Sequence, residues 1–113
     1  MIKIILLILV LSMESKIIAQ NIYSDVIKGE KRIEVASNGT IYLFNLSSSV
    51  LSRYNEKGIL NYSIGGQGFS DDRFDRPTSF HLSAGLTLLV CDTGNKRVMI
   101  YDRNLQKIGE INQ

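Results

Sequence analysis

Short apolar blocks recur along the chain from about residue 31 onward, separated by segments rich in Gly, Asn, Asp and Ser. Blocks of this length, rich in β-branched and aromatic residues, are typical of β-strands, and the polar segments between them are typical of turns. The pattern predicts strands at residues 32–36, 40–44, 50–54, 60–64, 78–82, 86–91, 97–101 and 107–111. We therefore expect an all-β chain, with no helix beyond its N-terminal segment.

The chain also repeats itself with a period of about 47 residues. Residues 40–58 align with residues 87–105, and the alignment superposes Leu43 on Val90, Asn45 on Asp92, Leu51 on Val98 and Tyr54 on Tyr101. Units of this length with four short strands are typical of the blades of a β-propeller. The repeat thus predicts two four-stranded antiparallel blades, at residues 32–66 and 67–113. Residues 21–31 are expected to be a linker or the outer strand of a neighbouring blade.

The middle strands of both units carry apolar residues at consecutive positions, as at residues 41–44 and 98–101. A strand with one solvated face would alternate between apolar and polar residues. Both faces of these strands are therefore expected to be covered, as they are when each blade packs between two neighbours. Two units cannot cover all of their own faces, so we expect one face of each to need a partner.

The clearest local signal is the stretch 88–102, in which two apolar strands flank a polar turn at residues 92–96. Gly94 tolerates the positive φ that such a turn requires, and the side chains of Asp92 and Asn95 can accept hydrogen bonds from unpaired backbone amides. A glycine-rich loop precedes this hairpin and ends at Pro77. The stretch is therefore predicted to be a β-hairpin.

The loop and the hairpin together resemble one repeat of the NHL family of β-propellers. The residues that match the family pattern, in order, are Gly65, Gly66, Gly68, Phe74, Pro77, Val90, Asp92, Thr93, Gly94, Asn95, Arg97 and Val98. Cys91, Lys96 and Ser79 depart from that pattern, and residues 46–49 of the first unit lack its Gly and Arg. The resemblance implies an NHL-type β-propeller, usually closed by six blades, in which Arg97 braces its own hairpin or the next blade.

Two blades make an incomplete ring under this interpretation. Either the chain is a truncated or split member of the family, or it completes a ring by self-association through its exposed blade faces. Open strand edges and bare apolar faces favour truncation, because a partial ring is hard to keep in solution.

The N-terminal segment begins with Lys3 and continues into an apolar run at residues 4–11, which charged residues at positions 14 and 16 interrupt. The run is shorter than the roughly 20 residues of a membrane-spanning helix. A short basic start followed by such a run predicts a helical signal peptide at residues 1–20, cleaved near Ala19. We therefore expect a secreted or periplasmic protein. The alternative is an uncleaved signal anchor, which would hold the chain at a membrane.

Charge and cysteine content narrow the classes of partner and chemistry. The net charge is +2, and it falls to +1 without residues 1–19 because two lysines and one glutamate are lost with them. Such a chain has no electrostatic preference for nucleic acid. Cys91 is the only cysteine, which excludes an internal disulfide, and its apolar surroundings suit an inert buried thiol better than a nucleophile.

The densest charge lies in the loop before the second unit and in the turn of its hairpin, which antiparallel strand order places at the same end of the sheet. The residues predicted to form a surface that binds a protein, peptide or glycan are Asp71, Asp72, Arg73, Asp75, Arg76, Asn95 and Lys96. The alternative is a solvated loop whose Asp and Arg side chains pair with one another. The acidic residues lack the spacing of a calcium loop, and the glycines lack the Lys-Ser/Thr pair of a phosphate-binding loop. We therefore expect no metal and no cofactor.

His81 is the only histidine and lies on the predicted first strand of the second unit. One histidine does not make a zinc site by itself, so a packing role is favoured. The leading hypothesis is a non-enzymatic exported binding module. Two alternatives stay open. One is a fragment of a six-bladed propeller enzyme of the metal-dependent lyase or lactonase kind, with His81 near the central channel, and the other is a truncated remnant without independent function.

Overall fold

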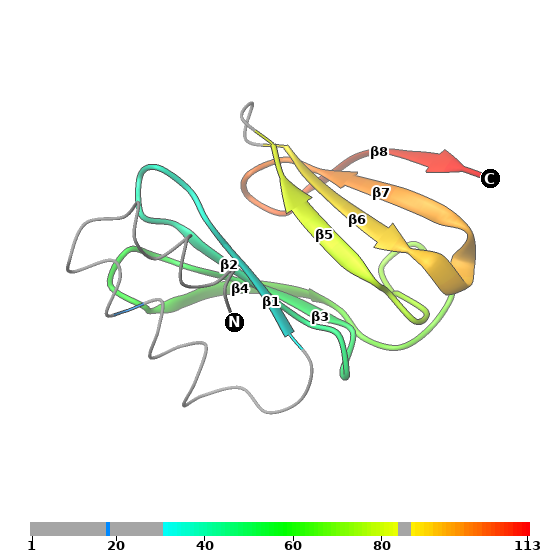
Figure 1. The fold of residues 1–113 in the computed structure, drawn as a ribbon, viewed down its shortest axis with the longest axis horizontal. Helices are drawn as coiled ribbons and strands as arrows, with labels where there is room; N and C mark the ends of the chain where they lie inside the picture. The colour runs from blue at the N-terminus through cyan, green and yellow to red at the C-terminus, as the bar shows by residue number, and fades with distance from the viewer. Residues whose placement is uncertain (1–17, 19–30, 84–86) are drawn as a thin grey trace.

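The computed structural model describes residues 18, 31–83 and 87–113, and these residues form two four-stranded β-sheets (Figure 1). The first sheet contains β1 (Lys31–Val35), β2 (Ile41–Asn45), β3 (Val50–Tyr54) and β4 (Leu60–Gly65). The second sheet contains β5 (Ser79–Leu82), β6 (Leu88–Asp92), β7 (Arg97–Tyr101) and β8 (Lys107–Asn112). Each sheet is a meander, because consecutive strands are neighbours and pair antiparallel throughout.

This architecture confirms the prediction of an all-β chain with two four-stranded antiparallel blades. All eight predicted strands are present, and their ends differ from the predicted ends by at most two residues. The turn after β6 contains a short 3-10 helix, Thr93–Asn95, which was not predicted. The predicted signal helix and the segment that follows it lie outside the described residues, apart from Ile18 and Lys31. No helix among the described residues is long and apolar enough to cross a membrane.

The two sheets repeat each other residue by residue. Each strand of the second sheet lies about 47 residues after its counterpart in the first. Both sheets have a register shift at the same place, between Arg53 and Tyr54 in β3 and between Ile100 and Tyr101 in β7. A residue and its counterpart therefore point to the same face of their respective sheets.

Two turns show the same repeat in their backbone angles. Ser49 and its counterpart Lys96 both have a left-handed backbone, with φ of 62° and 52°. In the turn between the last two strands of each sheet, Gly58 has a φ of 81° and its counterpart Leu105 has a φ of 64°. The sheets thus share their turn geometry even where glycine is replaced.

The pairing register sorts the side chains of each sheet onto two faces, because directly paired residues point the same way. The front face, as we name it, carries Ile33, Ile41, Leu43 and Tyr54 in the first sheet and their counterparts Phe80, Leu88, Val90 and Tyr101 in the second. The back face carries Tyr42, Phe44, Leu51 and Ile64 in the first sheet and their counterparts Leu89, Cys91, Val98 and Ile111 in the second.

The main core forms where the back face of the first sheet packs on the front face of the second. Phe44 is completely buried there and makes edge-on ring contacts with Phe80 of β5 and with Phe74 of the loop between the sheets, at centroid distances of 5.7 and 5.4 Å. The first strands of the two sheets, β1 and β5, lie close together near the middle of the molecule (Figure 1). Each sheet thus covers one face of the other, as neighbouring blades do.

The two outward faces of this pair differ. On the front face of the first sheet, Ile33, Ile41, Leu43 and Tyr54 form a second buried cluster, against which Ile18 packs. On the back face of the second sheet, the apolar residues of β6 and β7 are only half buried. The expectation that middle strands are covered on both faces therefore holds for β2 but not for β6.

Replacing Phe44 with alanine is expected to lower the free energy of unfolding by about 3–5 kcal/mol, because the change removes a buried ring that both sheets and the loop share. Denaturant unfolding followed by circular dichroism measures the loss. The matched control is Phe69→Ala, which removes the same group from a side chain that is 86% exposed. The control should change stability by less than about 0.5 kcal/mol. Equal losses in the two variants would contradict this assignment of the core.

Candidate functional site

The loop between β4 and β5, which contains most of the predicted binding surface, is held in shape by its own backbone. The Gly68 amide donates to the Phe74 carbonyl (2.8 Å), and the Phe74 amide donates to the Gly66 carbonyl (2.9 Å). The Gly66 amide also donates to the Ser49 carbonyl, in the turn between β2 and β3 (2.8 Å). Gly65 has a φ of 106°, and a Cβ there would lie 2.3 Å from the Ser49 oxygen, so only glycine fits.

A buried carboxylate, that of Asp92 at the end of β6, anchors this loop to the second sheet. Its oxygens accept hydrogen bonds from the Asp75 amide (2.7 Å), the Asn95 side-chain amide (2.9 Å) and Arg97 Nε (2.8 Å). The carboxylate is fully buried, and a buried charge is stable only when it is paired and hydrogen-bonded. Arg97 supplies the opposite charge. Asp92 therefore joins the loop, the turn and β7 at a single point.

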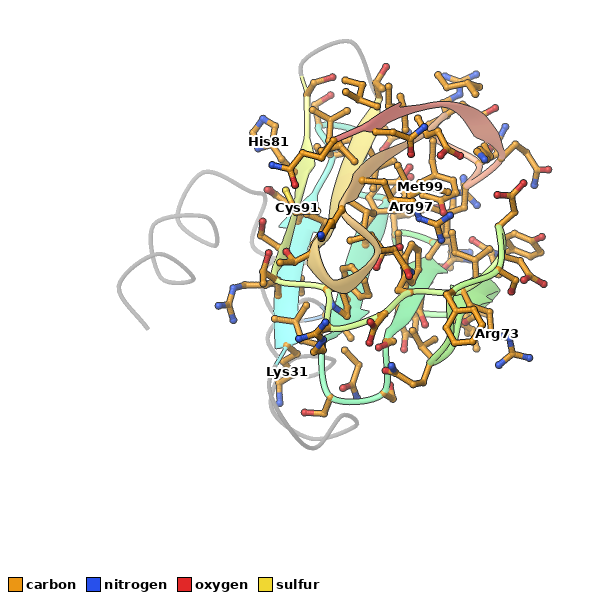
Figure 2. The ribbon with its side chains drawn as sticks, turned by 90° about the vertical axis from the view of Figure 1, so that its right-hand side faces the viewer. Lys31, Arg73, His81, Cys91, Arg97 and Met99 are labelled. Atoms are coloured by element: carbon orange, nitrogen blue, oxygen red, sulfur yellow. The ribbon has the colours of Figure 1, made fainter. Side chains whose placement is uncertain are left out.

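Arg97 extends this connection into the middle of the loop. Its Nη2 donates to the carbonyls of Ser70 (2.8 Å) and Arg73 (2.9 Å). A guanidinium presents several donors in one rigid plane, so it can hold two carbonyls and a carboxylate together. Figure 2 shows Arg97 directed into the body of the molecule, whereas Arg73 extends away from it. Arg97 thus braces the loop that leads into its own sheet.

The turn after β6 packs closely against Asp75 of the loop. The Gly94 amide donates to the Asp75 carbonyl (2.8 Å), and a Cβ on Gly94 would lie 2.3 Å from Asp75 Oδ2. The expectation of a positive φ at Gly94 is wrong, because Lys96 adopts it; glycine is needed here for the close approach of Asp75. Asp75 Oδ1 accepts a hydrogen bond from Gln67 Nε2 (2.8 Å) and lies 3.6 Å from Arg76 Nε. Within the described part of the chain, every buried side-chain nitrogen and oxygen has a hydrogen-bond partner. The loop is therefore fixed by many contacts along its length.

The residues predicted to form the binding surface divide into two groups. Asp75 and Asn95 direct their polar atoms to the loop and the turn themselves. The side chains that are exposed to solvent are those of Asp71, Asp72, Arg73, Arg76 and Lys96. The structure thus brings the predicted segments together but leaves only the second group free to contact a ligand.

Phe69 belongs to the same surface, and we did not predict it from the sequence. Its side chain is 86% exposed, whereas Phe74 of the same loop is completely buried. The signal that could have identified Phe69 is an aromatic residue inside a run of Gly, Ser and Asp, where no strand pattern would place it in a core. An exposed aromatic ring on a well-held loop is a typical feature of a binding surface.

A groove with an apolar floor lies beside the exposed carboxylates of the loop. It has a volume of about 280 Å³ and is lined by Tyr62, Ile64, Asp71, Asp72, Tyr101, Leu105, Gln106 and Lys107. Lys107 Nζ lies at its rim, 3.5 Å from Asp71 Oδ1 and 2.6 Å from Glu110 Oε1. The bond to Glu110 raises the pKa of Lys107 and lowers that of Glu110, and a bond from Ser70 lowers the pKa of Asp72. Lys107 and Asp72, which line the groove, and Glu110, which bonds Lys107, are therefore charged at neutral pH.

His81 and Cys91 lie away from this loop, on the back face of the second sheet (Figure 2). The His81 side chain is 69% exposed, with Nδ1 3.7 Å from Glu34 Oε1 of β1. The expectation of a packing histidine is therefore wrong, because this position on β5 leaves the ring in solvent. Cys91 is half buried. The described residues contain no group of three or more His, Cys, Asp or Glu side chains that could hold a metal ion.

Comparison with known proteins gives a relationship of fold alone. No family model matches the chain, and no curated protein matches its sequence. Its structure is similar to the crystal structure of a protein from Bacteroides fragilis NCTC 9343 that is named as a candidate exported protein, with a TM-score of 0.66 and 19% sequence identity. The similarity covers 79% of this chain and 25% of that one, so the chain spans about a quarter of the length of this relative.

Replacing Asp92 with asparagine keeps the size of the side chain but removes the buried counter-charge of the Arg97 guanidinium, and leaves only the exposed Asp71 carboxylate 3.7 Å from Arg97 Nη1. We expect a loss of about 3–5 kcal/mol in the free energy of unfolding. The control is Asp71→Asn, which makes the same change at a side chain that is 82% exposed and should alter stability by less than about 0.5 kcal/mol. Denaturant titration of both variants tests this. A stable Asp92→Asn variant would show that the buried pair does not anchor the loop.

Tyr101, which lines the groove, is expected to make the stability of the fold depend on pH in the alkaline range, because burial raises the pKa of its hydroxyl to about 12. In the unfolded chain the same proton leaves near pH 10. The folded state is therefore fully favoured below about pH 10 and loses stability as the pH rises from about 10 to 12. Tyr101→Phe should make the free energy of unfolding fall less steeply between about pH 9.5 and 11, measured by urea titration. Tyr62→Phe, at a side chain that is 46% exposed, should keep the steeper fall of the parent protein.

Proposed function

We propose that this chain is an exported binding module of NHL-type propeller architecture, which holds a protein, peptide or glycan against the loop between its two sheets. The apolar N-terminal run with its basic start supports export. The similar fold of a candidate exported protein from Bacteroides fragilis supports the same location. The roles of Asp92, Asn95 and Arg97 in pinning the loop support the NHL resemblance, because these residues carry the repeat pattern.

One observation carries the proposal: a loop that is held by buried contacts displays an exposed aromatic ring and two exposed carboxylates. Phe69, Asp71 and Asp72 project from backbone that Arg97 and Asp92 hold in place. A rigid surface loses little conformational entropy when it binds, so more of the contact energy appears as affinity. Aromatic residues are common anchors of such contacts, because one ring contributes a large apolar area.

The groove beside the loop indicates which ligand chemistry fits. Ile64 and Leu105 contribute apolar side chains to its lining, and Asp71 and Asp72 stand at its rim. An extended peptide that presents an apolar side chain next to a basic one would match both features. A glycan would instead stack a sugar on Phe69 and donate hydroxyl hydrogen bonds to the carboxylates.

Arrays of peptides and of glycans, probed with the exported protein, are expected to give binders that depend on the loop. Substituting alanine at Phe69, Asp71 and Asp72 together should weaken the best binder at least about tenfold, because it removes the anchor and the rim charges while the Asp92–Arg97 pair stays in place. The control substitutes alanine at Glu56 and Lys57, two exposed residues of the turn between β3 and β4, and should leave affinity unchanged. Isothermal titration measures both. Equal affinity in the loop variant and the parent would rule out this surface.

A further inference from the structure

The interface between the two sheets shows what each kind of blade face packs against in this protein. The back face of the first sheet, with Phe44 and Leu51, is covered by the front face of the second, with Phe80 and Val90. The chain also holds one front face and one back face that take no part in this interface. They are the front face of the first sheet and the back face of the second, at opposite ends of the stack.

The free back face of the second sheet is an apolar surface with a hollow. Cys91 and Val98 are half buried, Ile111 is 61% exposed, and the register places the three side by side across β6, β7 and β8. They contribute to the lining of a cavity of about 290 Å³. Their counterparts in the first sheet, which belong to the main core or pack against it, are Phe44, Leu51 and Ile64. This face therefore corresponds, position by position, to a face that is covered elsewhere in the same chain.

The front face of the first sheet is also apolar, as a partner for this back face would need to be. It carries Ile33, Ile41, Leu43 and Tyr54, and its counterpart on the second sheet is the surface that covers the back face of the first. Ile18 packs against this cluster. Ile18 lies within residues 1–20, which the sequence predicts to be removed on export. Removal of that segment would take a contact away from this front face.

We propose that the chain assembles head to tail with a second copy of itself, with the back face of the second sheet docked on the front face of the next copy's first sheet. This docking follows removal of residues 1–20. A second copy is the occupant because each chain carries both halves of an interface that it already forms internally. The contact is heterologous, so successive copies form a ring if the rotation closes and a filament if it does not.

The internal interface also predicts which residues meet between copies. The rings of Phe44 and Phe80 lie 5.7 Å apart between the sheets. The counterpart of Phe44 is Cys91 and the counterpart of Phe80 is Ile33. Cys91 of one copy should therefore lie beside Ile33 of the next. Because Cys91 is the only cysteine of the chain, a second thiol introduced at residue 33 creates one defined pair for crosslinking.

The first test uses the full chain expressed for export, with removal of the leader checked by intact mass. The Ile33→Cys variant, treated at low micromolar concentration with a short bismaleimide, should give a ladder of dimers, trimers and larger species. Unsubstituted protein can form only a Cys91–Cys91 dimer, which would report back-to-back contact. Ile108→Cys, at a position of β8 that is 59% exposed and outside the row of Cys91, Val98 and Ile111, should give no ladder. A ladder of equal strength in this control would overturn the assigned geometry.

The second test does not depend on a buried substitution. Ile111→Lys and Ile108→Lys make the same change on one strand, at side chains that are 61% and 59% exposed. Ile111 lies in the row of Cys91 and Val98 and lines their cavity, whereas Ile108 does neither. The Ile111→Lys variant should therefore associate at least about tenfold more weakly in sedimentation, because a lysine charge would be buried there. Ile108→Lys should associate like the parent. A processed chain that stays monomeric, a chain that keeps its leader after export, or equal effects of the two lysines would each overturn the proposal.

Discussion

The buried pairing of Asp92 with Arg97 is the constraint on which the rest of this structure depends. A carboxylate with no solvent access must find donors, and here the donors come from the loop, the turn and β7. The same arginine then holds two loop carbonyls, so the chain between the sheets has little freedom to rearrange. With the loop in place, Phe74 is fixed in the main core, where it joins the sheets through ring contacts to Phe44 and Tyr101. A polar anchor and an apolar core thus stabilise each other.

Rigidity of this kind connects the fold to the proposed function. The residues that make the loop rigid are buried, and the residues that stand out from it are an aromatic ring and charged side chains. Because the buried residues hold the loop and the exposed residues would contact the ligand, the exposed residues can be changed without disturbing the scaffold. The proposed assembly uses the outward faces of the stack, which do not include Phe69, Asp71 or Asp72. Lys96 is shared between the two surfaces, because it also lines the cavity on the back face of the second sheet.

The sequence predicted the eight strands and their repeat, because strand periodicity and turn chemistry are local signals. The sequence did not distinguish buried from exposed residues of the same type within one loop. Asp71 and Asp75 belong to one charged run, yet the first is 82% exposed while the second is drawn against Gln67 and the turn. Phe69 and Phe74 likewise differ only in where the folded loop places them. His81 was expected to be packed, but its exposure depends on what covers the back face of its sheet. Such differences arise from tertiary contacts that no local pattern records.

Leu105 shows how two units with the same turn geometry place different demands on one position. Its left-handed backbone, which costs a non-glycine residue on the order of 1 kcal/mol, persists while its side chain is 2% exposed in the main core. Gly58, its counterpart, meets the same backbone demand without a side chain. The same turn geometry therefore carries different constraints in the two units: glycine satisfies it in the first, whereas in the second a change of Leu105 to glycine would relieve the backbone and leave a void in the main core. Two units with equivalent backbones can in this way require different residues at equivalent positions, so that neither sequence could replace the other in the fold.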